Sequence, residues 1–489
     1  MKFAKFEYKH FLFYALWLLL AINLGQTTFS LLCSHHILFD DIEHLRAAYF
    51  ISLGDVPYRD FFEHHHPLLW YMLAPFISFF PHETVPAIYS GRLISLIISL
   101  ISGFYVYKTE KKFIGGTLCA LFCLNLYFWG DNAISVTGLF HVKPDIYQRC
   151  CFFIGLYYLF CYFRYQKFRH LQICALLWTM AFLFLQTTVF YVFPMVVPIG
   201  YFLYKNPQRW SNFAKASAVP IAIIVCCLVT LWQSGALTRY FETNWIFNKV
   251  YGSVWAHTTD NYFVWVNILD VLLIFCAALV FFIYQKKINI YMLTLVSGFV
   301  GELLLRMFFV SHYYYLVWLV IYAAMFAAPA VTKICLKFKV MFLPFIAVWA
   351  IHFNSNLQLV DCKEFSAFKY YISQTKGETV CSKVFTDRYS YYWMYPMLVE
   401  GLDDVLFHPV ADYDLEQVYR QRNSGILICP PIKDRQYQDV CKALNLNIEQ
   451  KAILQRHIID DFVKENYIKI KKNIYQRKDA ISPDETEKK

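Results

Sequence analysis

Runs of about 20 apolar residues recur along the chain, and they limit its fold more than any other feature of the sequence. A helix needs a run of this length to cross the hydrocarbon core of a bilayer. Apolar side chains make up 58% of the 489 residues, whereas charged ones make up only 16%, well below the share of about a quarter in soluble domains. The sequence therefore predicts a polytopic α-helical membrane protein.

Most Lys and Arg residues stand in short loops between these runs, and their positions predict the topology. The formal net charge of +10 is therefore an orientation signal, and nucleic-acid binding is excluded. Basic residues flank the segments 169–205 and 286–333, which requires an even number of crossings in each, so we divide them at Gln186–Thr188 and near Ser311. The chain then makes about eleven crossings, with its N-terminus in the cytoplasm and its C-terminal tail outside. The other spans are 11–32, 86–107, 113–130, 146–165, 213–235, 263–284 and 338–353.

The composition changes after Asn354 to that of a soluble domain. We predict a membrane domain over 1–353, a small α/β domain over 354–478 on the outer side, and a disordered charged tail over 479–489. The expected helices are 362–375, 414–422 and 434–445, and the expected strands are 379–385, 425–429, 467–470 and 473–476. Export would permit disulfides there, and three pairings are open to Cys362, Cys381, Cys429 and Cys441.

The first outer loop, residues 33–66, holds the densest group of acids and imidazoles in the chain. Within it, 41–53 has the periodicity of a short amphipathic helix, with Glu43 off the apolar stripe. Two interpretations of Asp40 stay open. It acts as a general base on an acceptor hydroxyl, or it caps this helix, because Asp40 followed by Glu43 resembles a capping box. The apolar segment 67–80 is too short to span and predicts an interfacial or re-entrant helix.

Three further polar groups have competing interpretations. Neighbouring residues on a helix do not share a face, so the run His64–His66 alone is a poor metal site. These histidines fit better as donors to a phosphate or as a polar stop before the next helix. Lys143 and Asp145 flank Pro144, which is an ordinary helix start or a polar pair of an outer site.

Glu302 and Arg306 lie four residues apart in a predicted span, on one helix face. Two interpretations stay open. In the first, Glu302 and Arg306 form an ion pair that fixes helix packing; in the second, Arg306 offers its guanidinium to a lipid-linked phosphate. Asp270 and Arg92 are weaker candidates of the same kind.

Taken together, these features resemble the C-type membrane glycosyltransferases, in particular the family-39-like enzymes of the protein mannosyltransferase and aminoarabinose transferase type. The likeness covers about residues 10–353. It is specific in two places: Asp40–Pro75, with its acidic pair, Glu-His step and the run Val56–His65, and the turn at 143–145. The acidic pair here is Asp-Asp where Asp-Glu is common, and His66 stands where many members have a proline.

The resemblance implies an inverting transferase that moves a hexose or pentose from a polyprenyl-phosphate donor to an acceptor hydroxyl, on the periplasmic side of a bacterial plasma membrane. The acceptor would be a lipid, a glycan or a protein. Asp40 would be the base or its close neighbour, Asp41 would lie beside it, and Asp145 would be the second acid. If the enzyme uses a divalent cation, Asp40 and Asp145 would hold it. The leaving phosphate needs positive partners, which would be Lys143, His65 and Arg306.

Two other classes of protein compete with an enzyme. A transporter or flippase of lipid-linked saccharides places ionisable residues near the middle of the membrane, as Asp270, Glu302 and Arg306 are placed in the sequence. The acids gather instead in outer loops, which favours an enzyme. A membrane scaffold that displays the outer domain predicts that Asp40→Asn has no effect.

Overall fold

The computed structural model describes residues 8–33, 39–61, 63–79, 84–134, 139–248, 275, 279, 289–308, 316–343, 346, 380–382, 397–399, 426–428, 465–471 and 474–478. The chain divides into two compact units. Unit 1 comprises Met1–Ser34, Arg92–Cys227 and Thr259–Leu359, and unit 2 comprises His35–Gly91, Leu228–Thr258 and Val360–Lys489.

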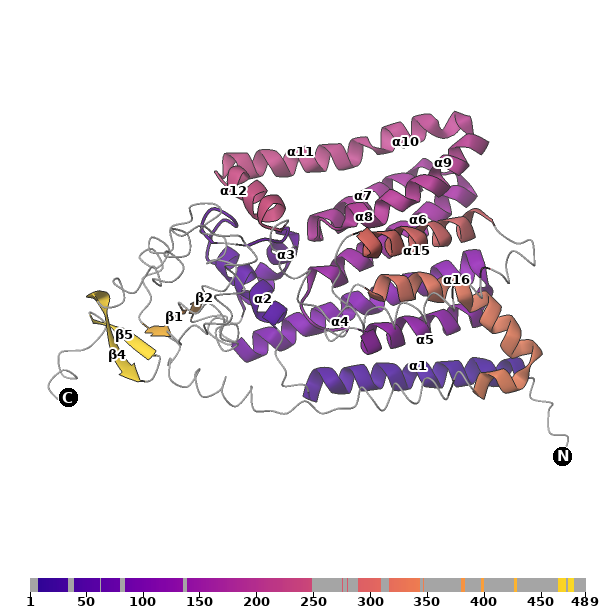
Figure 1. Ribbon diagram of the computed structural model, residues 1–489, viewed down its shortest axis with the longest axis horizontal. Helices are drawn as coiled ribbons and strands as arrows, with labels where there is room; N and C mark the ends of the chain where they lie inside the picture. The colour runs from indigo at the N-terminus through magenta and orange to yellow at the C-terminus, as the bar shows by residue number, and fades with distance from the viewer. Residues whose placement is uncertain are drawn as a thin grey trace. The chain divides into compact units, whose positions relative to one another are not determined.

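Unit 1 is a bundle of apolar helices. Figure 1 shows α1, α5 and α16 side by side, and the same figure shows α6 beside α7. The bundle is built from α1 (Tyr8–Cys33), α4 (Thr84–Thr109), η1 (Glu110–Ile114), α5 (Gly116–Ile134), α6 (Pro144–Tyr165), α7 (Phe168–Phe184), α8 (Thr188–Val192), η2 (Phe193–Met195), α9 (Val196–Lys205), η3 (Pro207–Arg209), α10 (Trp210–Ala216), α11 (Ala218–Gln233), α15 (Ile290–Phe308), α16 (Leu316–Lys337) and η6 (Lys339–Met341). Two of these helices, α4 and α11, belong partly to unit 2, because α4 begins before Arg92 and α11 ends after Cys227.

Six described segments are long and apolar enough to cross a membrane, so the chain is an integral membrane protein. They include the expected first span and the spans expected near 86–107, 146–165 and 213–235, which are therefore confirmed as helices. The span expected at 263–284 lies almost wholly outside the described residues, and the total of about eleven crossings stays a prediction. The six segments are Tyr8–Thr28, Pro86–Ile114, Pro144–Tyr165, Thr188–Lys205, Pro207–Gln233 and Trp318–Lys337.

The expected division at Gln186–Thr188 is confirmed, and a buried amide supports it. Helix α7 ends at Phe184, and Leu185 is extended, with φ −155°. An unsatisfied carbonyl is costly where water is absent, and the Leu185 carbonyl oxygen accepts from the backbone N–H of Thr188 over 3.1 Å and from its hydroxyl over 2.8 Å. The side-chain amide of Gln148, from α6, donates to this carbonyl over 3.3 Å and to the hydroxyl of Thr188 over 2.8 Å, so the break is stabilised from a neighbouring helix.

Small and aromatic side chains set how closely the helices of unit 1 pack. Gly155 of α6 faces Trp178 of α7, and a Cβ atom at Gly155 would lie 2.5 Å from the indole. The same indole stacks on Phe152 and donates its N–H to the Phe152 carbonyl over 3.2 Å. Glycine is therefore required where α6 meets α7, because a larger side chain would force the helices apart.

Unit 2 contains most of the segment 33–66, whose outer location stays a prediction, and a five-stranded sheet. The helices are α2 (Phe39–Ser52), α3 (Leu68–Ile77), α12 (Leu237–Phe241) and η4 (Glu242–Phe247). The strands are β1 (Val380–Ser382), β2 (Met397–Val399), β3 (Ile426–Ile428), β4 (Tyr467–Lys471) and β5 (Ile474–Arg477). Their order is β2-β1-β3-β5-β4, with β1 parallel to β2 and β3, and β5 antiparallel to β3 and β4.

Four of these strands fall where the sequence predicts them, including the terminal hairpin, whereas β2 was not expected. Because β1 is parallel to β2 and to β3, these strands need crossover connections. The three helices expected in this domain lie outside the described residues, so its α/β character and its outer location stay predictions. Cys381 lies in β1, and the other three tail cysteines lie outside the described residues.

Candidate functional site

Helix α2 brings the acids of the first outer loop together. It begins at Phe39, one residue before Asp40, so both aspartates stand in its first turn, where a carboxylate interacts favourably with the helix dipole. Asp41 is fully buried and Asp40 is partly exposed. The helix itself is confirmed. Its polar side, however, is buried rather than solvated, because Glu43 is only 5% exposed and His44 only 1%.

The loop between α2 and α3 is held by hydrogen bonds from Tyr58, Tyr240 and Asn248. Tyr58 adopts a left-handed φ of 68°, a strained conformation for a residue with a side chain. From there its hydroxyl donates to the carbonyl oxygen of His65 over 2.6 Å. Asn248 donates to the carbonyl of His64 over 2.7 Å, and the Tyr240 hydroxyl bonds His66 Nε2 over 3.1 Å. The three histidines are therefore fixed in a loop and face different partners.

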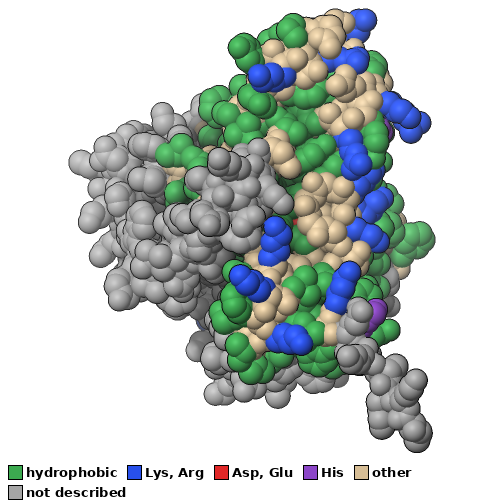
Figure 2. Space-filling view, turned by 90° about the vertical axis from the view of Figure 1, so that its right-hand side faces the viewer, with side chains coloured by type: hydrophobic (Ala, Val, Ile, Leu, Met, Phe, Trp, Pro, Cys, Tyr) green, Lys and Arg blue, Asp and Glu red, His purple; other side chains and the backbone are tan. Residues whose placement is uncertain are grey.

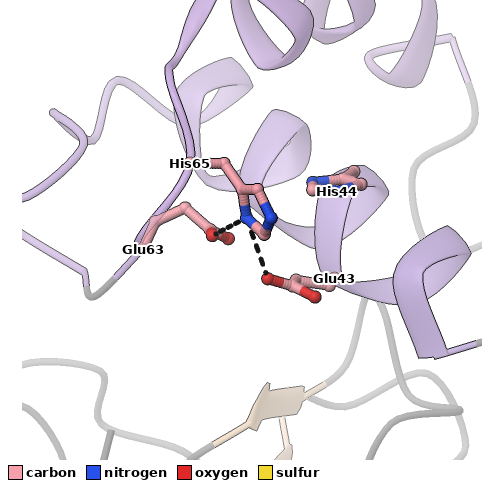
Figure 3. Close-up of side chains that lie close together, drawn as sticks. All are labelled: Glu43, His44, Glu63 and His65. Atoms are coloured by element: carbon pink, nitrogen blue, oxygen red, sulfur yellow. Dashed lines mark hydrogen bonds and ion pairs between the residues drawn. The ribbon is translucent and has the colours of Figure 1, made fainter. Parts of the chain in front are cut away.

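His65 lies between two buried carboxylates. Figure 3 shows its ring between Glu63, from the loop before α3, and Glu43, from α2. His65 Nδ1 is 3.0 Å from Glu63 Oε1 and 3.4 Å from Glu43 Oε1. Glu63 Oε1 also accepts the backbone N–H of His64 over 2.9 Å. Glu63 Oε2 is buried and makes no hydrogen bond within the described part of the chain.

The electrostatics separate the two neighbouring imidazoles. Burial opposes a charge on His65, but hydrogen bonds to the carboxylates of Glu43 and Glu63 outweigh it and hold the pKa of His65 well above its ordinary value. Burial and the nearby charge of His65 lower the pKa of His64 to about 3. The pair therefore carries one positive charge, on His65, and two carboxylates face that single charge.

A second imidazole, His44, is oriented by Trp70 of α3. The indole N–H of Trp70 donates to His44 Nδ1 over 3.2 Å. Because an indole nitrogen only donates, Nδ1 is the acceptor and the ring proton of neutral His44 is on Nε2. The ring of His44 meets that of His65 edge-on, with centroids 4.9 Å apart. His44 thus presents an N–H donor, suited to a phosphate oxygen or a carboxylate.

The cluster has the donor set for a divalent cation. One atom each from Glu43, His44, Glu63 and His65 lies within 4.8 Å of the others. The indole contact assigns the His44 proton to Nε2, which leaves Glu43, Glu63 and, once the arriving cation displaces the proton from its Nδ1, His65 as the ligands that fit. Their nitrogen–oxygen separations of 3.0 and 3.4 Å bracket the ligand spacing of about 3.3 Å in a tetrahedral site with metal–ligand bonds near 2.0 Å. The buried, unsatisfied Glu63 Oε2 is consistent with an ion there.

The sequence-predicted site residues divide between the two units. Asp40, Asp41 and His65 lie in unit 2, whereas Lys143 and Asp145 begin α6 of unit 1. Lys143 is buried at the N-cap position, Pro144 follows it, and Asp145 is partly exposed in the first turn. The meeting of Asp40 with Asp145 in one site, and a cation held by that pair, stay predictions.

The structure says less about the charged residues that the sequence places within membrane spans. Glu302 is buried in α15, and Arg306 lies in the same helix, with its side chain outside the described residues. Arg92 is buried, with its guanidinium 5.7 Å from the centre of the Phe140 ring, and Asp270 lies outside the described residues. The roles assigned to them from the sequence stay predictions.

Sequence reasoning did not assign Glu43, Glu63 or His44 to the site. The helical periodicity predicts only that Glu43 lies off the apolar stripe, and the run Val56–His65 gives Glu63 no role of its own. One signal was present: Glu63 directly precedes the histidine run, and carboxylate next to imidazole is a common ligand combination.

Comparison with known proteins places the fold. Residues 64–232 match the family model of the dolichyl-phosphate-mannose-protein mannosyltransferases. No curated protein matches the chain by sequence. The structure is similar to that of ArnT from Cupriavidus metallidurans, solved with bound undecaprenyl phosphate (TM-score 0.57, 10% identity) and in the apo state (TM-score 0.58, 11% identity); each comparison covers 87% of this chain and 94% of ArnT.

A further similarity is to the oligosaccharyltransferase of Archaeoglobus fulgidus, solved with a tethered acceptor peptide that contains the NVT sequon. The TM-score is 0.50 at 11% identity, over 90% of this chain and 72% of that one. The resemblance expected from the sequence is confirmed: the fold is that of the C-type membrane glycosyltransferases.

Proposed function

We propose that this chain, which has the C-type membrane glycosyltransferase fold, transfers a sugar from a polyprenyl-phosphate donor to an acceptor hydroxyl with inversion, on the periplasmic side of a bacterial inner membrane. The observation that carries the proposal is the buried cluster of Glu43, His44, Glu63 and His65 beside the α2 aspartates, in a fold shared with a protein solved with bound undecaprenyl phosphate. Buried carboxylates and imidazoles on clamped elements are typical of catalytic sites.

Asp40 is the proposed general base. The reaction forms a bond between the acceptor oxygen and the anomeric carbon, breaks the bond from that carbon to the phosphate oxygen, and sends the hydroxyl proton to the base. Asp40 is partly exposed whereas Asp41 is fully buried, which supports Asp40 as the carboxylate that an acceptor reaches. Asp41 then supports the helix start, and Asp145 stays the proposed second acid.

Positive partners stabilise the leaving phosphate. The protonated His65 and the Nε2–H of His44 are the proposed donors from unit 2, and Lys143 and Arg306 are the proposed donors from unit 1. In place of the proton on His65, a divalent cation held by Glu43, Glu63 and neutral His65 would supply Lewis-acid neutralisation of the phosphate oxygens. Glu43 and Glu63 also orient His65, so the loop presents the same imidazole face in every turnover.

The first experiment measures release of free polyprenyl phosphate from a labelled polyprenyl-phosphate sugar by the purified protein. We expect release by the wild type and a loss of at least a hundredfold in Asp40→Asn, because general-base catalysis contributes about 10²–10⁴ in rate. The matched control is Glu242→Gln, which removes a partly exposed carboxylate of unit 2. A flippase would move the donor without releasing polyprenyl phosphate, and a scaffold would be indifferent to Asp40→Asn; either result contradicts the proposal.

The second experiment tests the cation. We expect the purified protein to retain about one divalent ion per chain, measured by elemental analysis, and Glu63→Gln to retain at least a hundredfold less at equal free metal, since removing even an outer-shell partner costs about 10–100-fold. Activity with and without chelator then reports whether the ion takes part. If the wild type retains no ion and chelator has no effect, the protonated His65 acts alone.

A further inference from the structure

A second polar cluster lies in unit 1, where α4 continues into η1 and α6 ends. Charge in this part of the chain is strongly one-sided: Arg92–Cys227 contains 12 basic residues and three acidic ones, Glu110, Asp131 and Asp145. Figure 2 shows Lys and Arg side chains spread over one face of the molecule, between apolar side chains. The cluster consists of Lys108, Lys112, Arg164, Tyr157 and Tyr165.

Two ammonium groups share one aromatic ring. The Lys108 Nζ atom is 5.0 Å from the centre of the Tyr157 ring, and the Lys112 Nζ atom is 5.2 Å from it. The two charges are therefore at most about 10 Å apart, which is close to the Debye length of about 8 Å at physiological salt. Lys112 also donates to the Tyr157 hydroxyl over 3.2 Å. Like charges held this close repel each other unless an anion lies between them.

Arg164 adds a third cation, fixed to the same segment. Its Nη1 donates to the carbonyl of Lys112 over 3.2 Å, and its guanidinium is 5.6 Å from the centre of the Tyr165 ring. Lys112 lies 5.0 Å from that ring as well. A guanidinium has five N–H donors. The contact with Lys112 uses one of them, so Arg164 keeps donors for a bidentate contact with an oxyanion.

The described residues supply no carboxylate partner for these cations. Among the residues that the structure describes, no carboxylate forms an ion pair with Lys108, Lys112 or Arg164. Glu110 is next to them in sequence, but its side chain is buried and accepts a hydrogen bond from the Cys119 thiol over 3.1 Å. Within the described part of the chain, the three cations are therefore available to an added anion.

We propose that Lys108, Lys112 and Arg164 form a binding site for the phosphate of an anionic phospholipid headgroup. The site is at the end of the membrane span Pro86–Ile114, and Tyr165 beside it is 44% exposed. Tyrosine rings with long basic side chains are the combination found where a helix leaves the hydrocarbon core and meets lipid headgroups. This surface is independent of the cluster in unit 2 and of the proposed reaction.

The test is a lipid titration of the full chain in detergent, followed by native mass spectrometry. Phosphatidylglycerol, phosphatidylcholine and inorganic phosphate are titrated separately against the wild type, the triple variant K108Q/K112Q/R164Q, and the control triple variant K205Q/K215Q/K337Q. The control removes the same number of charges from cations of unit 1 outside the cluster, two of which lie over rings of their own: Lys205 over Tyr204 and Lys337 over Phe338.

We expect the wild type to bind phosphatidylglycerol more tightly than phosphatidylcholine. The cluster variant should lose about a hundredfold in phosphatidylglycerol affinity, at about fivefold per cation, while the control variant loses less than about fivefold. Equal binding of phosphatidylcholine, or an equal loss in the control variant, would overturn the proposal. Displacement of the lipid by inorganic phosphate would assign the site to free phosphate instead. If the cluster variant does not fold, K112Q alone carries the test: a fivefold loss supports the site and no loss overturns it.

Discussion

Replacing Glu63 with Gln removes one of the two charges that hold His65 and leaves the size of the side chain unchanged. Glu63 Oε1 lies 3.0 Å from His65 Nδ1 and 2.9 Å from the backbone nitrogen of His64. A hydrogen bond to a charged partner contributes about 1.5–3 kcal/mol, and the unscreened limit at this distance, with an effective dielectric constant of 20, is about 5 kcal/mol. The Gln carbonyl still accepts from the backbone, so we expect a loss of about 3 kcal/mol in the free energy of unfolding.

A loss of about 3 kcal/mol corresponds to a fall of about two units in the pKa of His65, since one unit corresponds to about 1.4 kcal/mol. The assay is a double-mutant cycle of Glu63→Gln and His65→Gln, measured by unfolding in detergent with chelator present so that no metal contributes. We expect a coupling energy of about 1.5–3 kcal/mol.

Glu242→Gln is the matched control for this cycle. The Glu242 pair with Arg239 is 3.8 Å long and both side chains are about one-third exposed, so its removal should cost less than about 1 kcal/mol. If the two changes at the buried pair are instead additive within about 0.5 kcal/mol, the carboxylate does not hold the imidazole, and the description of the cluster is wrong.

Three further predictions follow from single contacts. Trp70→Phe removes the donor to His44 and should cost about 1 kcal/mol, and nitrogen NMR should show the fixed Nε2–H tautomer of His44 giving way to a mixture. His64 is neutral in the fold but gains a proton when unfolded, so the free energy of unfolding falls as pH drops from 6.5 towards the folded pKa of about 3. Between pH 6.5 and 4.5 the loss is about 2.3 kcal/mol, and His64→Gln should lose that part of the acid sensitivity in thermal melts with chelator. Gly155→Ala should destabilise the protein by about 1–3 kcal/mol, because its Cβ would clash with the indole of Trp178. Gly200→Ala, with open space around it, should stabilise the protein by about 0.4–1 kcal/mol. Equal effects of the two substitutions would contradict the packing described for α6.

Much of the fold was predictable because its signals are local. A span is recognised from a continuous run of apolar residues, and the division at Gln186–Thr188 was correctly derived from basic residues at both ends of one segment. The strands β1, β3, β4 and β5 were recognised from short runs of β-forming residues next to turn residues. Strand β2 was missed because three residues carry too little periodicity to recognise.

The helix over 41–53 was also predicted correctly, but the environment of Glu43 was not. An amphipathic pattern states which side chains share a face, and assigning the polar face to water assumes that nothing polar covers it. Here the loop before α3 covers it with Glu63 and His65, which lie 3.0 Å apart and belong to a different element from Glu43. Periodicity within α2 contains no information about that loop.

The amino-acid sequence alone was enough to establish a membrane protein, most of its described helices, the acid- and histidine-rich first loop and the resemblance that names its fold. Tertiary structure decided which of those polar residues meet. Asn248 and Tyr240 contact the histidines from 184 and 174 residues away, and Trp70 selects the tautomer of His44 from a different helix. The reason is physical: helix and strand patterns follow from neighbouring residues in the chain, whereas the charge, tautomer and ligand geometry of a buried site depend on partners that only folding brings within hydrogen-bond distance.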